Sequence, residues 1–145
     1  METKTETIKV RYLPGSPVLE QTAIGGCVDL YNYEDVTLHG GEFTLINLGI
    51  ACEVPDGYDL IVIPRSSTFK RYGIIQPNSP GYVDHSYCGN DDIIFAPALA
   101  TRNIFIPHGT RCFQMRLVKC QPPVEFQMVA SLSNANRGGH GSTGK

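Results

Sequence analysis

Short runs of alternating apolar and polar residues follow one another along most of the chain. In the first run Ile8, Val10 and Tyr12 alternate with polar residues, a pattern that predicts a half-buried β-strand. Residues 14–17 end this strand, because their prolines and glycine favour a turn. Further runs predict strands over 26–38 (broken at 33–35), 43–54, 58–63, 93–95, 104–106, 112–118 and 124–129.

Turn-forming residues separate these runs, and among the later strands the separators are Pro97, 107–109 and 122–123. Residues 66–73 are the only good helix candidate, with a serine at the cap, two cations in the last turn and a glycine as the stop. That helix spans barely two turns. Residues 80–89 (PGYVDHSYCG) predict a tight hairpin bracketed by two glycines. We therefore predict an all-β sandwich or barrel with one short helix.

The end of the chain has a different composition from Ser131 onward. Ser, Asn, Gly and Thr dominate, and no apolar residue of any size follows Leu132. Such a segment cannot pack into a core. We expect a β domain over residues 1–130 and a flexible, glycine-rich C-terminal segment over 131–145.

Length and charge narrow the class of protein. The chain has 145 residues, enough for one domain, and a formal net charge of −2. It contains no block of Lys and Arg, so it lacks the electrostatic footprint expected for binding a nucleic acid polymer or an anionic membrane. A small polyanion remains compatible with this charge, because a few cations, backbone N–H groups and a metal ion can hold one triphosphate.

The five cysteines are odd in number and form no C-x-x-C pair, which argues against a disulfide framework and against a zinc knuckle. Residues 1–6 are charged where a signal peptide needs an apolar core, and no apolar run approaches membrane-spanning length. We expect reduced thiols and a cytoplasmic location.

Two segments in the first half carry candidate chemistry. Asp29 follows a pair of glycines, either as a solvated residue entering a strand or as a carboxylate that helps to hold Mg²⁺. Arg65 precedes Ser66 at the predicted helix start, so a cation and backbone N–H groups meet at one point that favours an anion. The simpler interpretation of that second segment is an ordinary helix cap with a surface arginine.

The predicted hairpin carries an acid, Asp84, and an aromatic residue, Tyr87. They are three positions apart, so a bulge or turn is needed to bring both to one site. Asp84 is ionised at neutral pH and is our candidate general base. The alternative is a hairpin with an exposed Asp and a core Tyr, which is common in β proteins.

These segments, together with 109–114 (GTRCFQ) and 137–144 (RGGHGSTG), resemble the five motifs of the dUTP pyrophosphatase (dUTPase) family. The resemblance keeps the family's order and covers most of residues 23–144. It departs from the family pattern at Ser67, where Gly is usual, at Thr110, where Asp is usual, and at His140, which replaces a stacking aromatic. The last motif is also two residues shorter after Arg137.

The resemblance implies a jelly-roll-like fold, a homotrimer with three shared sites, and Mg²⁺-dependent hydrolysis of dUTP to dUMP and pyrophosphate. Asp84 would be the catalytic base that activates water, and Asp29 would hold Mg²⁺ through water. Tyr87 would exclude a 2′-hydroxyl, and main-chain groups of the hairpin would read uracil. The substrate-binding residues implied are Arg65, Ser66, Ser67, Gly81, Val83, Tyr87, Gln114, Arg137, His140, Gly141, Ser142 and Thr143.

Two alternatives stay open. The first is a dCTP deaminase of the same fold, because residues 65–67 followed by 70–73 resemble its signature. That reaction needs a glutamate in the strand after the hairpin, and residues 90–99 contain none. The second is a nucleotide-sensing regulatory protein whose main contact is another protein. Asp29, Asp84, Arg137 and Ser142 together favour hydrolysis.

Overall fold

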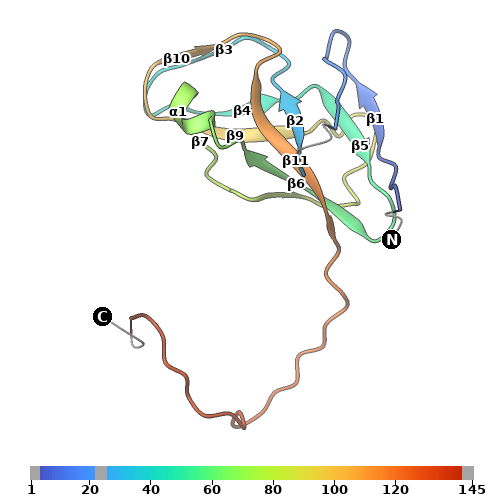
Figure 1. The fold of residues 1–145 in the computed structure, drawn as a ribbon, viewed down its shortest axis with the longest axis vertical. Helices are drawn as coiled ribbons and strands as arrows, with labels where there is room; N and C mark the ends of the chain where they lie inside the picture. Colours follow the sequence, from blue (N-terminus) through green and yellow to red (C-terminus); the bar gives the residue numbers. More distant parts are fainter. Residues whose placement is uncertain (1–3, 22–25, 142–145) are drawn as a thin grey trace.

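Strands form most of the regular structure in residues 4–21 and 26–141, the part of the chain that the computed structural model describes (Figure 1). The strands are β1 (Lys9–Tyr12), β2 (Val28–Tyr31), β3 (Val36–Leu38), β4 (Phe43–Asn47), β5 (Ile50–Glu53), β6 (Tyr58–Pro64), β7 (Ile74–Ile75), β8 (Gly81–Val83), β9 (Phe95–Ala100), β10 (Ile104–Ile106) and β11 (Arg111–Lys119). The helix α1 spans Thr68–Tyr72. Within these residues, no helix is long and apolar enough to span a membrane.

The strands pair antiparallel throughout, as in a jelly roll, and partners are often far apart in the sequence. The largest sheet has the order β2-β11-β6-β8, and its central pair is β6 with β11. A second sheet has the order β4-β9-β7, and the pairs β1-β5 and β10-β3 complete the described strands. This all-β architecture agrees with the sandwich that the sequence predicts.

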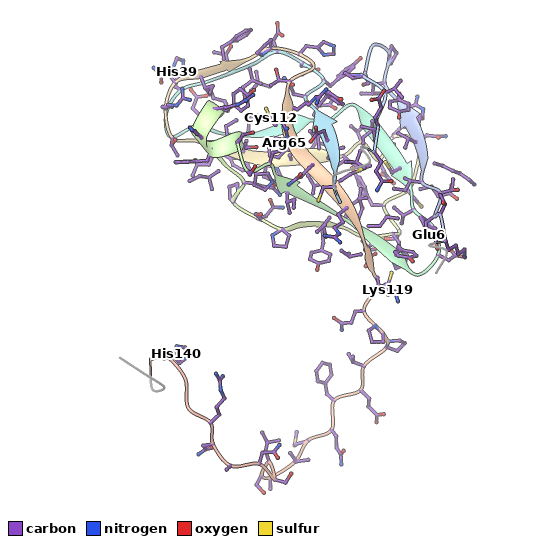
Figure 2. All side chains as sticks on the ribbon, viewed as in Figure 1. Glu6, His39, Arg65, Cys112, Lys119 and His140 are labelled. Atoms are coloured by element: carbon purple, nitrogen blue, oxygen red, sulfur yellow. The ribbon has the colours of Figure 1, made fainter. Side chains whose placement is uncertain are left out.

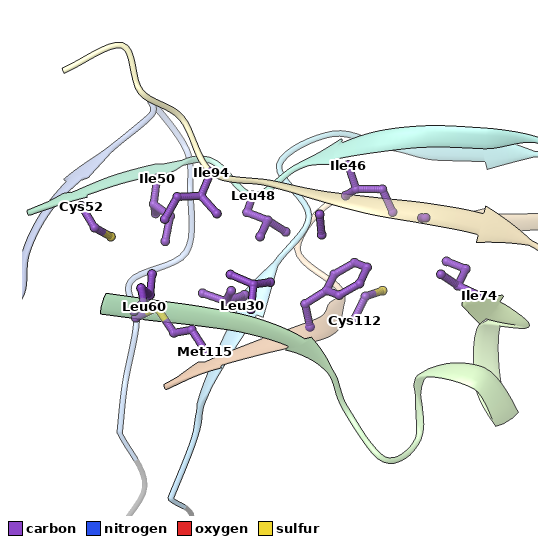
Figure 3. Packing of buried hydrophobic residues seen from close by; sticks show 14 of the residues in the cluster. Leu30, Ile46, Leu48, Ile50, Cys52, Leu60, Ile74, Ile94, Cys112 and Met115 are labelled. Carbon is purple, nitrogen blue, oxygen red and sulfur yellow. The ribbon is translucent and has the colours of Figure 1, made fainter. Parts of the chain in front are cut away.

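The core lies between the layers, where alternate residues of facing strands meet (Figure 3). Leu30, Leu60 and Met115 project from the large sheet, and Ile46 and Ile94 face them from the other side. All five are buried, with at most 3% of their surface exposed. The period-two pattern that predicts the strands therefore also selects the side chains that fill the core.

A buried asparagine joins β2 to the loop before β11. The Asn32 side chain is 0% exposed; its amide N–H groups donate to the carbonyls of Glu34 (2.8 Å) and Pro107 (2.9 Å). Its Oδ1 accepts the N–H of Thr110 at 2.7 Å. These bonds are at least partly shielded from water, so the side chain supplies hydrogen bonds that the loop backbone would otherwise lack.

The helix prediction is confirmed in position but not in its cap. Gly73 ends α1 in the left-handed conformation, with φ of 62°, as its glycine predicts. Ser67 occupies the N-cap position, but among the described residues its side chain makes no capping hydrogen bond. The hydroxyl of the adjacent Thr68, which is fully buried, instead accepts the N–H of Arg65, ahead of the helix.

Three strand predictions are wrong. Pro97 does not end a strand but lies inside β9, where it pairs with Leu45 of β4. On the other side of β9, β7 pairs only with Leu99 and Ala100. No described strand therefore lies beside Pro97 on that side, and the N–H that proline lacks is not needed there. Residues 124–129 form no strand, since they extend past the sandwich with Phe126 92% exposed. Residues 80–89 form no self-paired hairpin: Gly81–Val83 pairs with β6, and tight turns follow.

We expect Asn32→Ala to lower the free energy of unfolding by about 2–4 kcal/mol, because several part-buried backbone groups lose their partners at once. Urea denaturation at a fixed protein concentration measures this change. Asn103→Ala is the matched control, since Asn103 accepts one N–H, from Gly40, at an exposed position, and we expect a loss below about 1 kcal/mol. Equal losses in the two variants would contradict the role assigned to Asn32.

Candidate active site

Two arginines converge on one carboxylate at the end of the large sheet. Asp29 Oδ1 lies 3.0 Å from Arg65 Nε, and Asp29 Oδ2 lies 3.6 Å from an Arg111 guanidinium nitrogen. The Arg65 guanidinium also donates to the Arg111 carbonyl at 3.1 Å. The Asp29 and Arg65 side chains are half-buried, with 26% and 29% exposure. The cluster therefore carries one more positive than negative charge in a partly dehydrated place, which favours an anion.

Strand register brings these residues together. Asp29 on β2 faces Gln114 on β11, and Gln114 faces Ile63 on β6. Arg65 follows β6 directly, and the Gln114 side chain donates to the Pro64 carbonyl at 3.1 Å. The register of β11 shifts just before Phe113, a bulge that turns the start of the strand.

Thr68 holds Arg65 in place, and the sequence patterns did not single it out. Its Oγ1 accepts the backbone N–H of Arg65 at 2.9 Å, while its own N–H donates to the Arg65 carbonyl at 3.1 Å. The same hydroxyl donates to the buried carbonyl of Cys112. A threonine three residues after an arginine, at the start of a helix, is the signal that could have found this reciprocal pairing.

A cleft of about 360 Å³ opens beside this cluster. Four residues predicted for the site line it: Asp29, Arg65, Ser66 and Gln114. The other lining residues are Glu20, Gly26 and Cys27. Ser67, also predicted, is half-buried next to Ser66 but is not among the lining residues.

A second group gathers around the turn after β8. Asp84 Oδ1 accepts the backbone N–H of Ser86 at 2.8 Å and its hydroxyl, and these bonds hold the pKa of the Asp84 carboxyl below its usual value. The Tyr87 N–H donates to the Asp84 carbonyl at 2.9 Å, and its hydroxyl donates to the Ile93 carbonyl at 2.7 Å. Partial burial raises the pKa of Tyr87. This turn brings the acid and the aromatic to one side, as the sequence required.

A shallow groove of about 380 Å³ collects this second group. Its lining residues are Tyr82, Val83, Asp84, Tyr87, Ile93, Ile94 and Phe95. Gly81 is buried at the start of β8, where an added Cβ would come within 2.9 Å of Gln76 Nε2 and 3.2 Å of the Val62 carbonyl oxygen. Packing against β6 is therefore one reason for this glycine.

Within one chain the two groups lie far apart. Arg65 directly follows the last residue of β6. Asp84 comes directly after β8, whose last residue, Val83, pairs with Leu60. Asp84 therefore lies beside Asp59, near the first residue of β6. Six residues of strand separate Asp59 from Arg65, which corresponds to about 20 Å. The fold therefore separates the predicted base from the cleft beside Arg65 in the same chain.

The predicted tail residues lie elsewhere again. Arg137, His140 and Gly141 are exposed on a segment that leaves the sandwich after Lys119, and His140 lies far from Arg65 (Figure 2). Ser142 and Thr143 lie outside the described residues. The structure of one chain thus brings four predicted residues to the cleft, a second set to the groove, and the tail residues to neither.

Solved structures share this fold. A Staphylococcus bacteriophage 80alpha dUTPase with dUPNHPP superposes with a TM-score of 0.78 over 97% of this chain and 100% of that chain, at 19% identity. A dUTPase from Streptococcus mutans gives a TM-score of 0.71 over 80% of this chain and 98% of that chain, at 21% identity. At this identity the likeness establishes the jelly-roll-like fold.

Sequence comparison gives the family. A family model described as dUTPase matches residues 20–144, and the chain belongs to the dUTPase family. The SPbeta prophage-derived deoxyuridine 5′-triphosphate nucleotidohydrolase YosS of Bacillus subtilis (strain 168) is 45% identical over 94% of this chain and 97% of its own length. The deoxyuridine 5′-triphosphate nucleotidohydrolase of Hydrogenobaculum sp. (strain Y04AAS1) is 37% identical over 81% of this chain and 82% of its own length.

We expect Thr68→Val to lower the free energy of unfolding by about 1–3 kcal/mol, because the Arg65 N–H and the Cys112 carbonyl each lose a buried partner. Ser67→Ala is the control, because no capping bond from its hydroxyl occurs among the described residues, and we expect a change within about 0.5 kcal/mol. Urea denaturation measures both. A larger loss for Ser67→Ala would return the capping role to the serine.

Proposed function

We propose that the chain is a dUTP pyrophosphatase that hydrolyses dUTP to dUMP and pyrophosphate, by attack of an Asp84-activated water on the α-phosphorus. The observation that carries the proposal is the half-buried Arg65, which Asp29 holds at 3.0 Å and which lines a cleft with Ser66 and Gln114. A guanidinium group held in a fixed orientation suits the oxygen atoms of a phosphate group. The names of the relatives with 45% and 37% identity, both deoxyuridine 5′-triphosphate nucleotidohydrolases, support dUTP as the substrate.

In this proposal the cleft binds the phosphates. Arg65, Ser66 and Ser67 contact them from the segment between β6 and α1, and Gln114 contacts the nucleotide or the attacking water. Asp29 keeps the Arg65 guanidinium oriented through its 3.0 Å contact, so the cation is positioned before the substrate arrives.

The groove around β8 binds the nucleoside. In the described large sheet, β8 is the terminal strand, so one edge of Gly81–Val83 faces away from β6 and can offer N–H and C=O groups to uracil. Tyr87 packs under the deoxyribose and leaves no space for a 2′-hydroxyl. Its hydroxyl bond to Ile93 supports this role by fixing the ring.

Asp84 acts as the base. The hydrogen bonds from Ser86 favour its ionised form, so it accepts a proton from water at neutral pH. The same two bonds occupy one carboxylate oxygen, Oδ1. The other oxygen, Oδ2, would then orient the water toward the phosphorus.

Asp29 fits a magnesium ion that is held through water. Both carboxylate oxygens already contact guanidinium groups, at 3.0 and 3.6 Å, which disfavours a direct metal bond beside two cations. Each oxygen keeps a further lone pair that can accept a hydrogen bond from metal-bound water. When bound, Mg²⁺ would neutralise charge on the triphosphate. A phage phi11 dUTPase solved with a structural Mg(II) ion shares the fold, with a TM-score of 0.74 over 88% of this chain and 99% of that chain, at 18% identity.

A homotrimer with shared sites would unite the separated groups. About 20 Å separates Arg65 from the strand end beside Asp84, whereas both must lie within a few ångströms of the same α-phosphate. A neighbouring copy that presents its Asp84 and Tyr87 to this cleft would complete the site, and rotational symmetry would repeat it three times. Residues 131–145 would form a lid, with Arg137, His140 and Gly141 closing over a neighbour's site together with Ser142 and Thr143.

We expect the wild-type protein to release pyrophosphate and dUMP from dUTP, but no product from dCTP, dTTP or UTP, and to lose this activity with EDTA. Asp84→Asn should lower kcat about 100- to 10,000-fold, because it removes a general base. Asp91→Asn, a change to another exposed acid after the same turn, should leave kcat unchanged. Ammonia release from dCTP would show that the protein is a deaminase instead. Unchanged turnover by Asp84→Asn would show that Asp84 is not the general base.

We expect mixed trimers of two inactive variants to regain activity. When Arg65→Ala and Asp84→Asn chains are co-refolded in equal amounts, one site in four should combine an intact Arg65 with an intact Asp84, which gives about a quarter of wild-type turnover. Each variant refolded alone is the control. An inactive mixture, with mixed oligomers verified by mass, would mean that the two residues do not act in one shared site.

A further inference from the structure

Three side chains with metal-binding atoms meet at the end of the β6–β11 pair that lies away from the cleft. Asp59 comes from β6, His85 from the turn after β8, and Cys120 directly follows β11. His85 Nδ1 lies 2.9 Å from Asp59 Oδ1 and 3.7 Å from Cys120 Sγ, and the three potential ligand atoms all lie within 4.8 Å of one another. Neither the cleft nor the groove includes any of the three.

Backbone hydrogen bonds fix the positions of these residues. The Cys120 N–H donates to the Gly57 carbonyl at 2.9 Å and extends the ladder between β11 and β6 by one residue. The His85 N–H donates to Asp59 Oδ1 at 3.0 Å. A ligand set that the fold already holds together loses little conformational freedom when it binds an ion.

The donor set suits a transition metal. Zn²⁺ takes imidazole nitrogen, thiolate sulfur and carboxylate oxygen, and its tetrahedral geometry needs ligand atoms about 3.3–3.6 Å apart. The two printed distances from His85 Nδ1, 2.9 Å to Asp59 and 3.7 Å to Cys120, lie within a few tenths of an ångström of these values, and the His85 side chain is 61% exposed, so it can adjust. Two anionic ligands also balance the charge of a divalent ion. Mg²⁺ prefers oxygen ligands alone, so the two kinds of metal would bind at different places.

A catalytic Cys–His–Asp relay does not explain the cluster. Such a relay needs the acid and the nucleophile on different ring nitrogens, whereas Asp59 and Cys120 both face Nδ1 of His85. A metal ion bound in place of the protons between these groups would instead be coordinated by Asp59, His85 and Cys120 together.

We propose that Asp59, His85 and Cys120 bind one transition-metal ion of the Zn²⁺ type, and that the bound ion lowers hydrolysis by drawing Asp84 away from its water. The site has three protein ligands and an open fourth position. Asp84 Oδ1 lies 4.0 Å from His85 Nδ1 and points to the same region. A carboxylate this close to the ion would exchange its bonds with Ser86 for the metal. The inhibitory part rests on the proposed role of Asp84, whereas the binding part does not.

Cobalt titration of the reduced, full-length protein tests the site. Co²⁺ replaces Zn²⁺ in such sites and gives a thiolate-to-cobalt absorption band that reports the Cys ligand directly. We expect one ion per chain with this band, its loss in Cys120→Ser, and binding about a hundredfold weaker in His85→Gln, since each change removes one ligand of three. Cys88→Ser changes an exposed thiol of the same turn and should bind as the wild type does. A band that survives Cys120→Ser, or disappears in Cys88→Ser, would overturn the assignment.

The inhibitory role is tested by Zn²⁺ added to the wild-type protein and to Cys120→Ser, each with dUTP and saturating Mg²⁺. Without zinc we expect equal turnover. With zinc, half-inhibition of Cys120→Ser should need at least tenfold more metal. If zinc inhibited the two proteins equally while cobalt bound as expected, the metal site would be supported and its effect on Asp84 would be contradicted. No turnover by either protein would contradict the proposed function and leave the cobalt result standing.

Discussion

The antiparallel pairing of β6 with β11 is the constraint on which the rest of the structure depends. Seven residue pairs, from Phe113↔Pro64 to Lys119↔Tyr58, fix how these two strands align. At one end the alignment sets Gln114 beside the segment that carries Arg65, and it lets Thr68 reach the Cys112 carbonyl. At the other end it sets Cys120 beside Gly57. A shift of one residue would exchange core and surface along the shifted strand and separate both groups of polar residues.

The two ends of this strand pair have different chemistry. One end combines guanidinium groups with a carboxylate, which suits phosphate oxygen and hard, hydrated cations. The other end combines imidazole and thiol groups with a carboxylate, which suits softer metals. The Asp84 turn lies at this second end, as the contact between His85 and Asp59 shows. The chemistry of one chain is thus distributed along its central strands.

Sequence patterns predicted the parts of this structure that local chemistry controls. Alternation found most strands because burial on one face leaves a period of two, and Gly73 marked the helix end because it adopts a positive φ. Four of the residues that line the cleft were predicted, because they lie in motifs that follow the family's order. Pairing between segments far apart in the sequence could not be predicted from local patterns. Pro97 is tolerated because of where β7 joins β9, and Thr68 acts through a carbonyl 44 positions away.

The exposed segment after β11 and the packed sandwich differ in their sensitivity to proteases. Every residue of the core cluster and every partly buried hydrophobic residue packed against it lies between Ile8 and Leu117. Residues 121–141 are exposed throughout. A protease therefore meets a cleavable segment without waiting for the sandwich to open, so the rate of trimming follows protease concentration rather than folding stability. Loss of Arg137 and His140 would leave behind a domain that is still folded and still resists further digestion.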